Sequence, residues 1–162
     1  MIGRRENLLE SLKQDITAKY PAAKIHTIAM SVTDLEKVKD LPSTLPEEYQ
    51  DVEVLVNNAG LALGVASVDE NDMKDAETVL NTNVLSIIAL CRALVPGMKQ
   101  RGSGHIINIG SIAGHVTYSQ GFNSLLLTPA LLHLITYSSI KVLHTMQVST
   151  PWLALLTLLD TT

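Results

Sequence analysis

The chain of 162 residues is long enough for one domain with a buried core, and too short for a nucleotide-binding domain plus a separate substrate domain. Hydrophobic residues make up 46% of the sequence and the net charge is -4, a balance that argues against disorder and against a nucleic-acid partner. Cys91 is the only cysteine, which rules out an internal disulfide. Because the chain opens with charged residues instead of a secretory signal, we expect a cytoplasmic protein.

The first fifty residues predict a helix, a strand and a second helix. A helical repeat spans residues 4–20 and is stopped by Pro21. A strand is predicted over 24–30, and Asp34 begins a brief helix that runs to about Asp40. The apolar positions of the first helix are Leu8, Leu9, Leu12 and Ile16.

The middle of the chain alternates buried strands with a long helix. Residues 42–49 read as a loop, and 52–57 form a nearly continuous apolar strand, as in a parallel sheet covered on both faces. A helix is predicted over 71–100, with Pro96 near its end, and another buried strand over 105–110. Strands separated by helices predict an α/β fold with a doubly wound parallel sheet of the Rossmann type.

The rest of the chain is nearly uncharged. After Arg101 only Lys141 and Asp160 carry a formal charge. The apolar run over 125–135 is interrupted by Pro129 and is shorter than the roughly 20 residues that cross a bilayer, so we expect no membrane span.

Four motifs resemble the short-chain dehydrogenase/reductase family, and their order in the chain also matches that family. They are VLVNNAG at 54–60, NTNVLS with Asn83, INIGSIAG at 107–114 and YSSIK at 137–141. The likeness covers residues 3–121 and resumes at 137. GRREN and NNAGLALG are similar to the branch that oxidises serine and related 3-hydroxy acids with NADP. The resemblance therefore implies an oxidoreductase that moves a hydride between NADP and a small hydroxy or carbonyl compound.

Tyr137 and Lys141 are the candidate proton-transfer pair. A hydride arriving at a carbonyl carbon leaves an oxygen that needs a proton, which a side chain must supply. A tyrosine with its ordinary pKa of about 10 needs roughly 4 kcal/mol of phenolate stabilisation to act near neutral pH. An ammonium about 4 Å away provides an interaction of that size, and i,i+4 spacing puts both side chains on one helix face.

The resemblance assigns further roles around this pair. Ser111 donates a hydrogen bond to the substrate oxygen, and Asn83 holds a water that relays protons to Lys141. Arg4 and Arg5 suit a 2′-phosphate, which favours NADP over NAD. The remaining cofactor-binding residues are Asn57, Asn58, Ala59, Gly60, Tyr137 and Lys141.

Each assignment has a simpler alternative. Tyr137 and Lys141 also fit a solvated helix face, and Arg4 and Arg5 fit a charged first helical turn. Asn57 and Asn58 also fit an ordinary turn, Ser111 the end of a strand, and Asn83 a polar helix position. The histidines show no metal-ligand spacing, so we predict no metal site.

The sequence also departs from the family pattern. The first strand with its glycine-rich loop and the last strands are missing, and Ser31 stands where the family has an aspartate. Tyr137 follows Ser111 by about twice the family's separation, which predicts an apolar insertion at 122–136.

We therefore predict a single incomplete dinucleotide-binding domain over 1–162. Its parts are a family-like core at 1–121, the apolar insertion at 122–136, and a truncated active-site helix with an apolar tail at 137–162. A missing central strand leaves an apolar edge, so we expect a homo-oligomer. Two hypotheses follow: an NADP-dependent oxidoreductase, or a catalytically silent fragment that is stable only on association.

Overall fold

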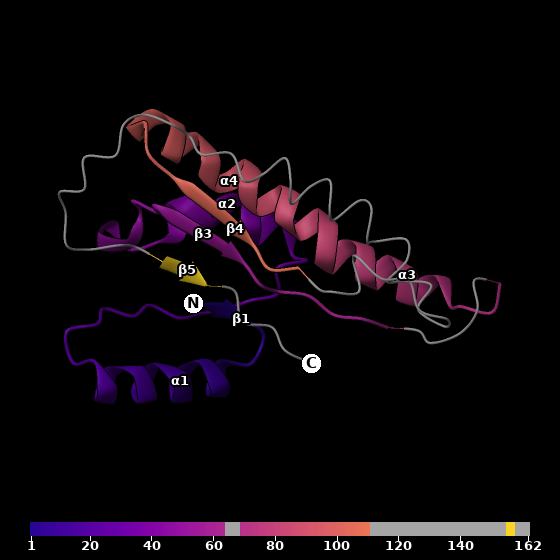
Figure 1. Ribbon diagram of the computed structural model, residues 1–162, viewed down its shortest axis with the longest axis horizontal. Coiled ribbons are helices and arrows are strands. Elements are labelled where there is room, and N and C mark those ends of the chain that lie inside the picture. Colours follow the sequence, from indigo (N-terminus) through magenta and orange to yellow (C-terminus); the bar gives the residue numbers. More distant parts are fainter. Residues whose placement is uncertain (64–68, 111–154, 158–162) are drawn as a thin grey trace.

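The computed structural model describes residues 1–63, 69–110 and 155–157, the last of these through the backbone (Figure 1). The element η1 is a 3-10 helix and η2 is a π-helical segment. In chain order the elements are β1 (Ile2–Gly3), α1 (Glu6–Lys19), β2 (Ile28–Ala29), α2 (Leu35–Thr44), η1 (Glu47–Tyr49), β3 (Val54–Asn57), α3 (Met73–Leu80), η2 (Asn81–Leu85), α4 (Ser86–Arg101), β4 (His105–Asn108) and β5 (Leu155–Thr157).

All strand pairs within the described residues are parallel. β1 pairs with β2, and a second sheet has the order β4-β3-β5. Figure 1 shows α2 and α4 on one side of the strands and α1 on the other, with β5 drawn between β3 and β1. This arrangement confirms the predicted α/β fold with a parallel sheet.

The strands are shorter than predicted. The strand expected over 24–30 is only β2, because its ladder partner β1 has two residues and the hydrogen-bonded register ends with it. The strands expected over 52–57 and 105–110 begin or end within two residues of β3 and β4. Hydrogen bonds from the His105 and Ile109 amides to Glu53 and Asn57 nevertheless extend the pairing beyond the ladder.

Helix α1 begins after Arg5, whose carbonyl accepts hydrogen bonds from the amides of Leu8 and Leu9, each at 3.1 Å. It ends at Lys19, and Tyr20 is the capping residue directly before Pro21, where the sequence predicted the stop. Of the expected apolar stripe, Leu9 alone is fully buried, and 48% of the Leu8 surface is exposed. The helix is therefore lightly covered by the part of the chain that the structure describes.

Helix α2 runs past the predicted end at about Asp40 and includes Pro42. A proline this close to a helix end removes few hydrogen bonds, and burial of Val38 and Leu41 keeps the helix in place against α4. The residues predicted as a loop at 42–49 are consequently partly helical, because they hold the end of α2 and the whole of η1.

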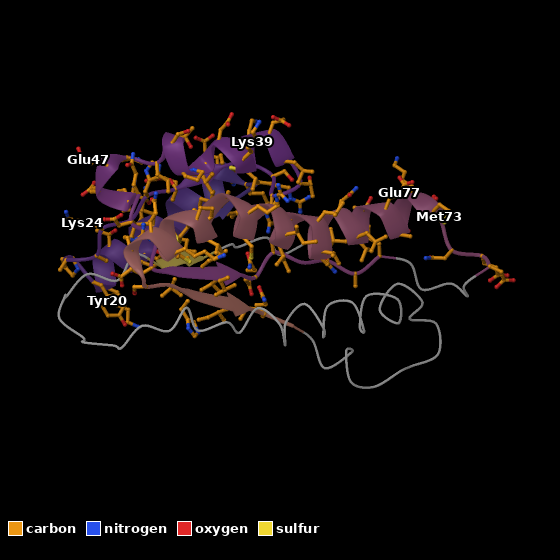
Figure 2. The ribbon with its side chains drawn as sticks, turned by 90° about the horizontal axis from the view of Figure 1, so that it is seen from above. Tyr20, Lys24, Lys39, Glu47, Met73 and Glu77 are labelled. Atoms are coloured by element: carbon orange, nitrogen blue, oxygen red, sulfur yellow. The ribbon has the colours of Figure 1, made fainter. Side chains whose placement is uncertain are left out.

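The long helix predicted over 71–100 is divided into three parts. α3 is followed without a break by the π-helical η2 and then by α4, which ends at Gly102 in the left-handed conformation with φ 68°. π-helical segments within α-helices commonly mark functional positions. Figure 2 shows Met73 and Glu77 at the far end of this helical rod.

The 29-residue rod Met73–Arg101 is long and apolar enough to cross a membrane, judged by length and composition alone. Within its α4 part, Leu90, Leu94 and Met98 are buried against the rest of the described chain. Figure 2 shows Lys39 and Glu47 on the outer surface near α2, away from the strands.

In the described residues an apolar cluster joins β3, α2 and α4, and half-buried Cys91 packs against it. Its buried members are Ile2, Met30, Val32, Val38, Leu41, Leu45, Val52, Leu55, Ala59, Leu90, Leu94 and Met98.

Candidate functional site

A pocket of about 210 Å³ opens where three chain segments leave their strands. The residues that follow β1, β2 and β3 form one side, and the residues of α3 and η2 form the other. Crevices at the carboxyl ends of parallel strands are the usual binding sites of open α/β sheets. The lining residues are Arg4, Ser31, Val32, Thr33, Leu61, Thr78, Asn81 and Thr82.

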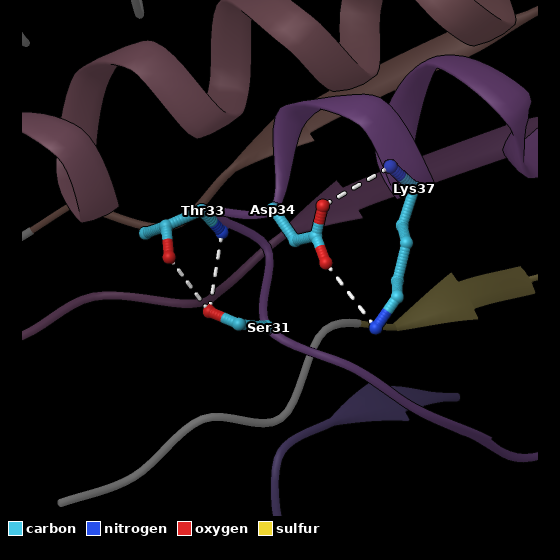
Figure 3. Close-up of polar contacts among 4 residues, drawn as sticks. All are labelled: Ser31, Thr33, Asp34 and Lys37. Atoms are coloured by element: carbon cyan, nitrogen blue, oxygen red, sulfur yellow. Dashed lines mark hydrogen bonds and ion pairs between the residues drawn. The ribbon is translucent and has the colours of Figure 1, made fainter.

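Two hydroxyl groups lie together in this pocket. The Ser31 and Thr33 hydroxyl oxygens are 2.8 Å apart, and the Thr33 amide donates to the Ser31 hydroxyl at 3.3 Å (Figure 3). Each hydroxyl can donate or accept, so the pair presents adaptable hydrogen-bonding groups where the family pattern has an aspartate. With Ser31 at that position, none of the residues that line the pocket is an aspartate or a glutamate.

Asp34 directly follows the hydroxyl pair and is the N-cap of α2, so the pair lies at the start of a helix. The Asp34 carboxylate accepts a hydrogen bond from the Lys37 amide at 3.3 Å, and its second oxygen lies 3.2 Å from the Lys37 ammonium (Figure 3). The backbone hydrogen bond, followed by the side-chain contact with Lys37, holds the pKa of Asp34 below its ordinary value. Asp34 serves here as the helix cap and faces its own helix.

The two predicted arginines differ in position. Arg4 directly follows β1 and lines the pocket, where its guanidinium supplies a positive charge. Arg5 is the residue before the first turn of α1 and does not line the pocket. The geometry thus brings one of the two predicted phosphate ligands to the site.

Asn57 ends β3 and is buried, with 2% of its surface exposed. Its Nδ2 donates to Asn108 Oδ1 at 2.8 Å, which ties the end of β3 to the end of β4. The side chain also hydrogen-bonds the Cys91 thiol; burial raises the pKa of that thiol and the hydrogen bond opposes the rise. Within the described residues Asn57 Oδ1 has no hydrogen-bond partner.

Asn57 therefore joins β3 to β4 through its side chain and through its carbonyl, which accepts a hydrogen bond from the Ile109 amide at 2.9 Å, and it does not line the pocket. Asn58 is half-buried, while Ala59 is buried in the core cluster. Gly60 is exposed, and a Cβ placed there would meet Asn83 Oδ1 only at 3.6 Å. The turn thus leaves its last residue open to an approaching molecule.

The Asn83 side chain makes two hydrogen bonds to the turn that follows β3. Its Oδ1 accepts from the Leu61 amide at 3.0 Å and its Nδ2 donates to the Leu61 carbonyl at 2.8 Å. The residue lies in η2, where the wider helical turn interrupts the α-helical repeat. Both polar atoms of the side chain predicted to hold a relay water are directed at the backbone of Leu61.

The chemical centre predicted from the sequence lies outside the described residues. Ser111, Tyr137 and Lys141 all fall there, as do the predicted insertion at 122–136 and most of the predicted tail. No group of three or more His, Cys, Asp or Glu residues able to hold a metal ion occurs in residues 1–63 and 69–110.

The lining residues on the helical side of the pocket were not singled out from the sequence. Thr78, Asn81 and Thr82 lie on consecutive turns of α3 and η2 and face the pocket together. Their spacing of three and four residues could have indicated one polar helix face beside the NNAG turn. The assembled pocket offers one cation, several hydroxyls and open backbone, which suits a ligand with a phosphate and hydroxyl groups.

The family model of the short chain dehydrogenases matches residues 1–123. The chain is 36% identical over 121 residues to an NADP-dependent 3-hydroxy acid dehydrogenase of Schizosaccharomyces pombe, covering 75% of this chain and 46% of that protein. It is 39% identical over 119 residues to a Salmonella typhi protein of the same name, covering 74% of this chain and 46% of that protein. The chain therefore spans about half the length of the curated relatives that it matches.

Solved structures agree with this likeness. A crystal structure of serine dehydrogenase from Escherichia coli superposes with a TM-score of 0.73 at 34% identity, over 84% of this chain and 60% of that one. A closed form of serine dehydrogenase complexed with NADP+ gives the same TM-score and identity, over 84% of this chain and 52% of that one. The parallel sheet, the NNAG turn bordering a pocket, and the match over 1–123 show that this chain belongs to the short-chain dehydrogenase family.

Proposed function

We propose that this chain provides the NADP-binding part of an oxidoreductase that acts on a small hydroxy compound, such as a 3-hydroxy acid of the size of serine. The observation that carries the proposal is the pocket between Arg4, the Ser31 and Thr33 hydroxyls and the turn at Leu61. Curated relatives named as NADP-dependent 3-hydroxy acid dehydrogenases support the choice of cofactor and substrate class.

The described residues fit the phosphate-bearing adenosine end of NADP. The Arg4 guanidinium is the group that a 2′-phosphate requires, and NAD has no phosphate there to bind it. Ser31 and Thr33 can hydrogen-bond ribose hydroxyls or the adenine ring, since each hydroxyl donates and accepts. We therefore propose NADP as the preferred cofactor, with Arg4 as its main determinant.

Asn58, Ala59 and Gly60 contribute through their backbone, and Asn57 ties the start of this turn to β4. The turn follows the carboxyl end of β3, and Gly60 leaves room for close approach. Asn83 is a positioning residue for this turn, because its side chain holds the Leu61 backbone from both sides.

We propose that the proton chemistry belongs to Ser111, Tyr137 and Lys141. Bound NADP supplies or accepts the hydride. The Tyr137 hydroxyl exchanges a proton with the substrate oxygen, the Lys141 ammonium favours the phenolate form, and the Ser111 hydroxyl donates to the same oxygen. We further propose that the protein is cytoplasmic.

Fluorescence titration with NADPH tests the cofactor part of the proposal. Arg4→Ala should weaken NADPH binding by about tenfold or more, because a charge-assisted hydrogen bond is worth roughly 1.5–3 kcal/mol. Binding of NADH, which lacks the 2′-phosphate, should change little. Lys39→Ala is the matched control: it removes an equal charge from an exposed position on α2. Equal losses in the two variants, or no NADPH binding by the unaltered chain, would contradict the proposal.

A second candidate is a catalytically silent domain. The separation of Tyr137 from Ser111, about twice that of the family, favours it. Turnover measurements with Tyr137→Phe separate the two candidates: an enzyme loses turnover and keeps NADPH binding. A silent domain shows no turnover in either form, whether or not it binds the cofactor.

A further inference from the structure

The helical wall of the pocket consists of Thr78, Asn81 and Thr82, and it faces the chain segments that follow β1 and β2. Thr82 is buried, with 5% of its surface exposed, and Thr78 is half-buried. Asn81 is the exposed member of the three. Its side chain is therefore the part of this wall that a ligand in the pocket can reach most readily.

The Asn81 side chain also has hydrogen-bonding groups to spare. The hydroxyls of Ser31 and Thr33 bond each other at 2.8 Å, and the Thr78 hydroxyl donates to the Lys74 carbonyl at 2.7 Å. Within residues 1–63 and 69–110, by contrast, no residue hydrogen-bonds the Asn81 amide. The amide thus offers a donor, Nδ2, and an acceptor, Oδ1, side by side.

Apolar side chains border the pocket between its polar groups. Val32 is buried, with 2% of its surface exposed, and Leu61 is held in place by the two hydrogen bonds from Asn83 to its backbone. Binding pockets commonly cover the faces of a ligand with apolar groups and fix its orientation with a few polar ones. The pocket therefore suits a flat ring whose polar edge meets the Asn81 amide.

Adenine is a ring of this kind, because its amino group donates beside a ring nitrogen that accepts. An asparagine amide can make two hydrogen bonds to such an edge. In NADP the adenine and the 2′-phosphate are attached to neighbouring carbons of one ribose, so a phosphate bound by Arg4 brings the base into the same pocket. We propose that Asn81 recognises the adenine base of NADP through its side-chain amide and so determines which nucleobase is accepted. This inference rests on the proposed function.

Calorimetric titration of the unaltered chain with NADP+ and with etheno-NADP+ gives the first test. In the etheno derivative a two-carbon bridge joins the amino nitrogen of adenine to the adjacent ring nitrogen, and no N–H remains to donate to Asn81 Oδ1. NADP+ should bind about tenfold or more tightly than the derivative. Equal affinities would overturn the inference and leave the proposed function standing, whereas no binding of either ligand would overturn both.

Asn81→Leu supplies the second test, because leucine is close to asparagine in size and has no polar side-chain atom. The variant should bind NADP+ about tenfold or more weakly than the unaltered chain, and its affinity for etheno-NADP+ should change by less than about twofold. The preference for NADP+ then disappears. Since Asn81 is exposed, the fold should be retained, as an unchanged circular dichroism spectrum would show. A preference that persists in this variant would refute the inference.

Thr78→Val is the matched control on the same wall. Valine keeps the shape of threonine and removes a hydroxyl that already donates to the Lys74 carbonyl. This variant should prefer NADP+ over etheno-NADP+ as strongly as the unaltered chain does. Loss of the preference in both variants alike would show that packing of the helical wall selects the base, and would overturn the role of the Asn81 amide.

Discussion

The Asn83 side chain joins the π-helical segment to the turn after β3, and its removal has a defined cost. Asn83→Ala deletes two hydrogen bonds to Leu61 and leaves a partly buried amide and carbonyl without them. We expect a loss of about 1–3 kcal/mol in the free energy of unfolding, measured by urea denaturation.

Asn81→Ala is the control for this prediction. Asn81 lies in the same η2 segment and is the same residue type, but it is exposed. Its replacement should change the free energy of unfolding by less than about 0.5 kcal/mol. If both variants lost the same free energy of unfolding, the two hydrogen bonds from Asn83 to Leu61 would contribute nothing to stability.

The Asp34 carboxylate, which caps α2, makes the stability of the folded chain depend on pH. Its pKa is lowered in the folded chain, so folding favours the ionised form, and the unfolded state binds more protons in this range. The stabilisation is fully present above the ordinary value of 3.8 and is lost as pH falls through the lower folded pKa.

Asp34→Asn keeps an oxygen that can accept the Lys37 hydrogen bond but carries no charge. We expect this variant to be less stable than the unaltered chain at neutral pH, and the difference to shrink as pH is lowered below 3.8. Urea denaturation at several pH values measures it, with Asp40→Asn on the same helix as control. A difference that is constant with pH would contradict the assignment.

At the scale of elements, the connection from α4 to β4 is tightly packed. A Cβ at Gly104 would lie 2.6 Å from the Cβ and Cγ of buried Met98, atoms that cannot swing away. Gly104→Ala should therefore lower the free energy of unfolding by about 1–3 kcal/mol.

Gly97→Ala is the matched comparison, because both changes restrict the unfolded chain alike. A Cβ at Gly97, inside α4, would meet only Arg101 Nη1 at 3.2 Å, at the end of a long side chain that hydrogen-bonds Asp51 and can shift by a few tenths of an ångström. Higher helix propensity should make this variant more stable by up to about 1 kcal/mol. Thermal denaturation followed by circular dichroism measures both, and equal shifts would mean that the Met98 contact yields without cost.

At the scale of the whole molecule, the fold class and the segment order could be predicted from hydrophobic period and motif order. The apolar run at 52–57 predicted a buried strand and NNAG the turn after it, whereas Asn83 was predicted to hold a relay water and its contact with this turn was not foreseen. Helix ends were harder: Pro42 predicts a stop, but packing of α2 on α4 outweighs one lost hydrogen bond.

The pocket and β5 could not be predicted for two different physical reasons. The pocket is assembled from Arg4, Ser31 and Thr82, which lie far apart in the chain, so the sequence pattern does not show that they meet in one pocket. β5 lies in a stretch that is apolar throughout, and such a run has no period that separates a strand from a buried helix. The sequence therefore predicted an open edge beside β3. In the structure that edge is paired with β5.

The open end of the NNAG turn gives a prediction that separates folding from binding. Gly60 is exposed, its φ is not in the left-handed region, and a Cβ there would make one ordinary contact with Asn83. Gly60→Ala should therefore leave the free energy of unfolding within about 0.5 kcal/mol of the unaltered chain. If a cofactor approaches this backbone closely, the added methyl group should weaken NADPH binding by about tenfold or more.

Urea denaturation without ligand and NADPH titration, performed on the same preparation, measure the two effects. Gly97→Ala serves again as control, because its site on α4 does not line the pocket and its NADPH affinity should be unchanged. Retained affinity in Gly60→Ala would place the ligand away from the turn. Lost stability together with lost affinity would instead make Gly60 a requirement of the fold, since only a change confined to binding reports the approach of the cofactor to the backbone.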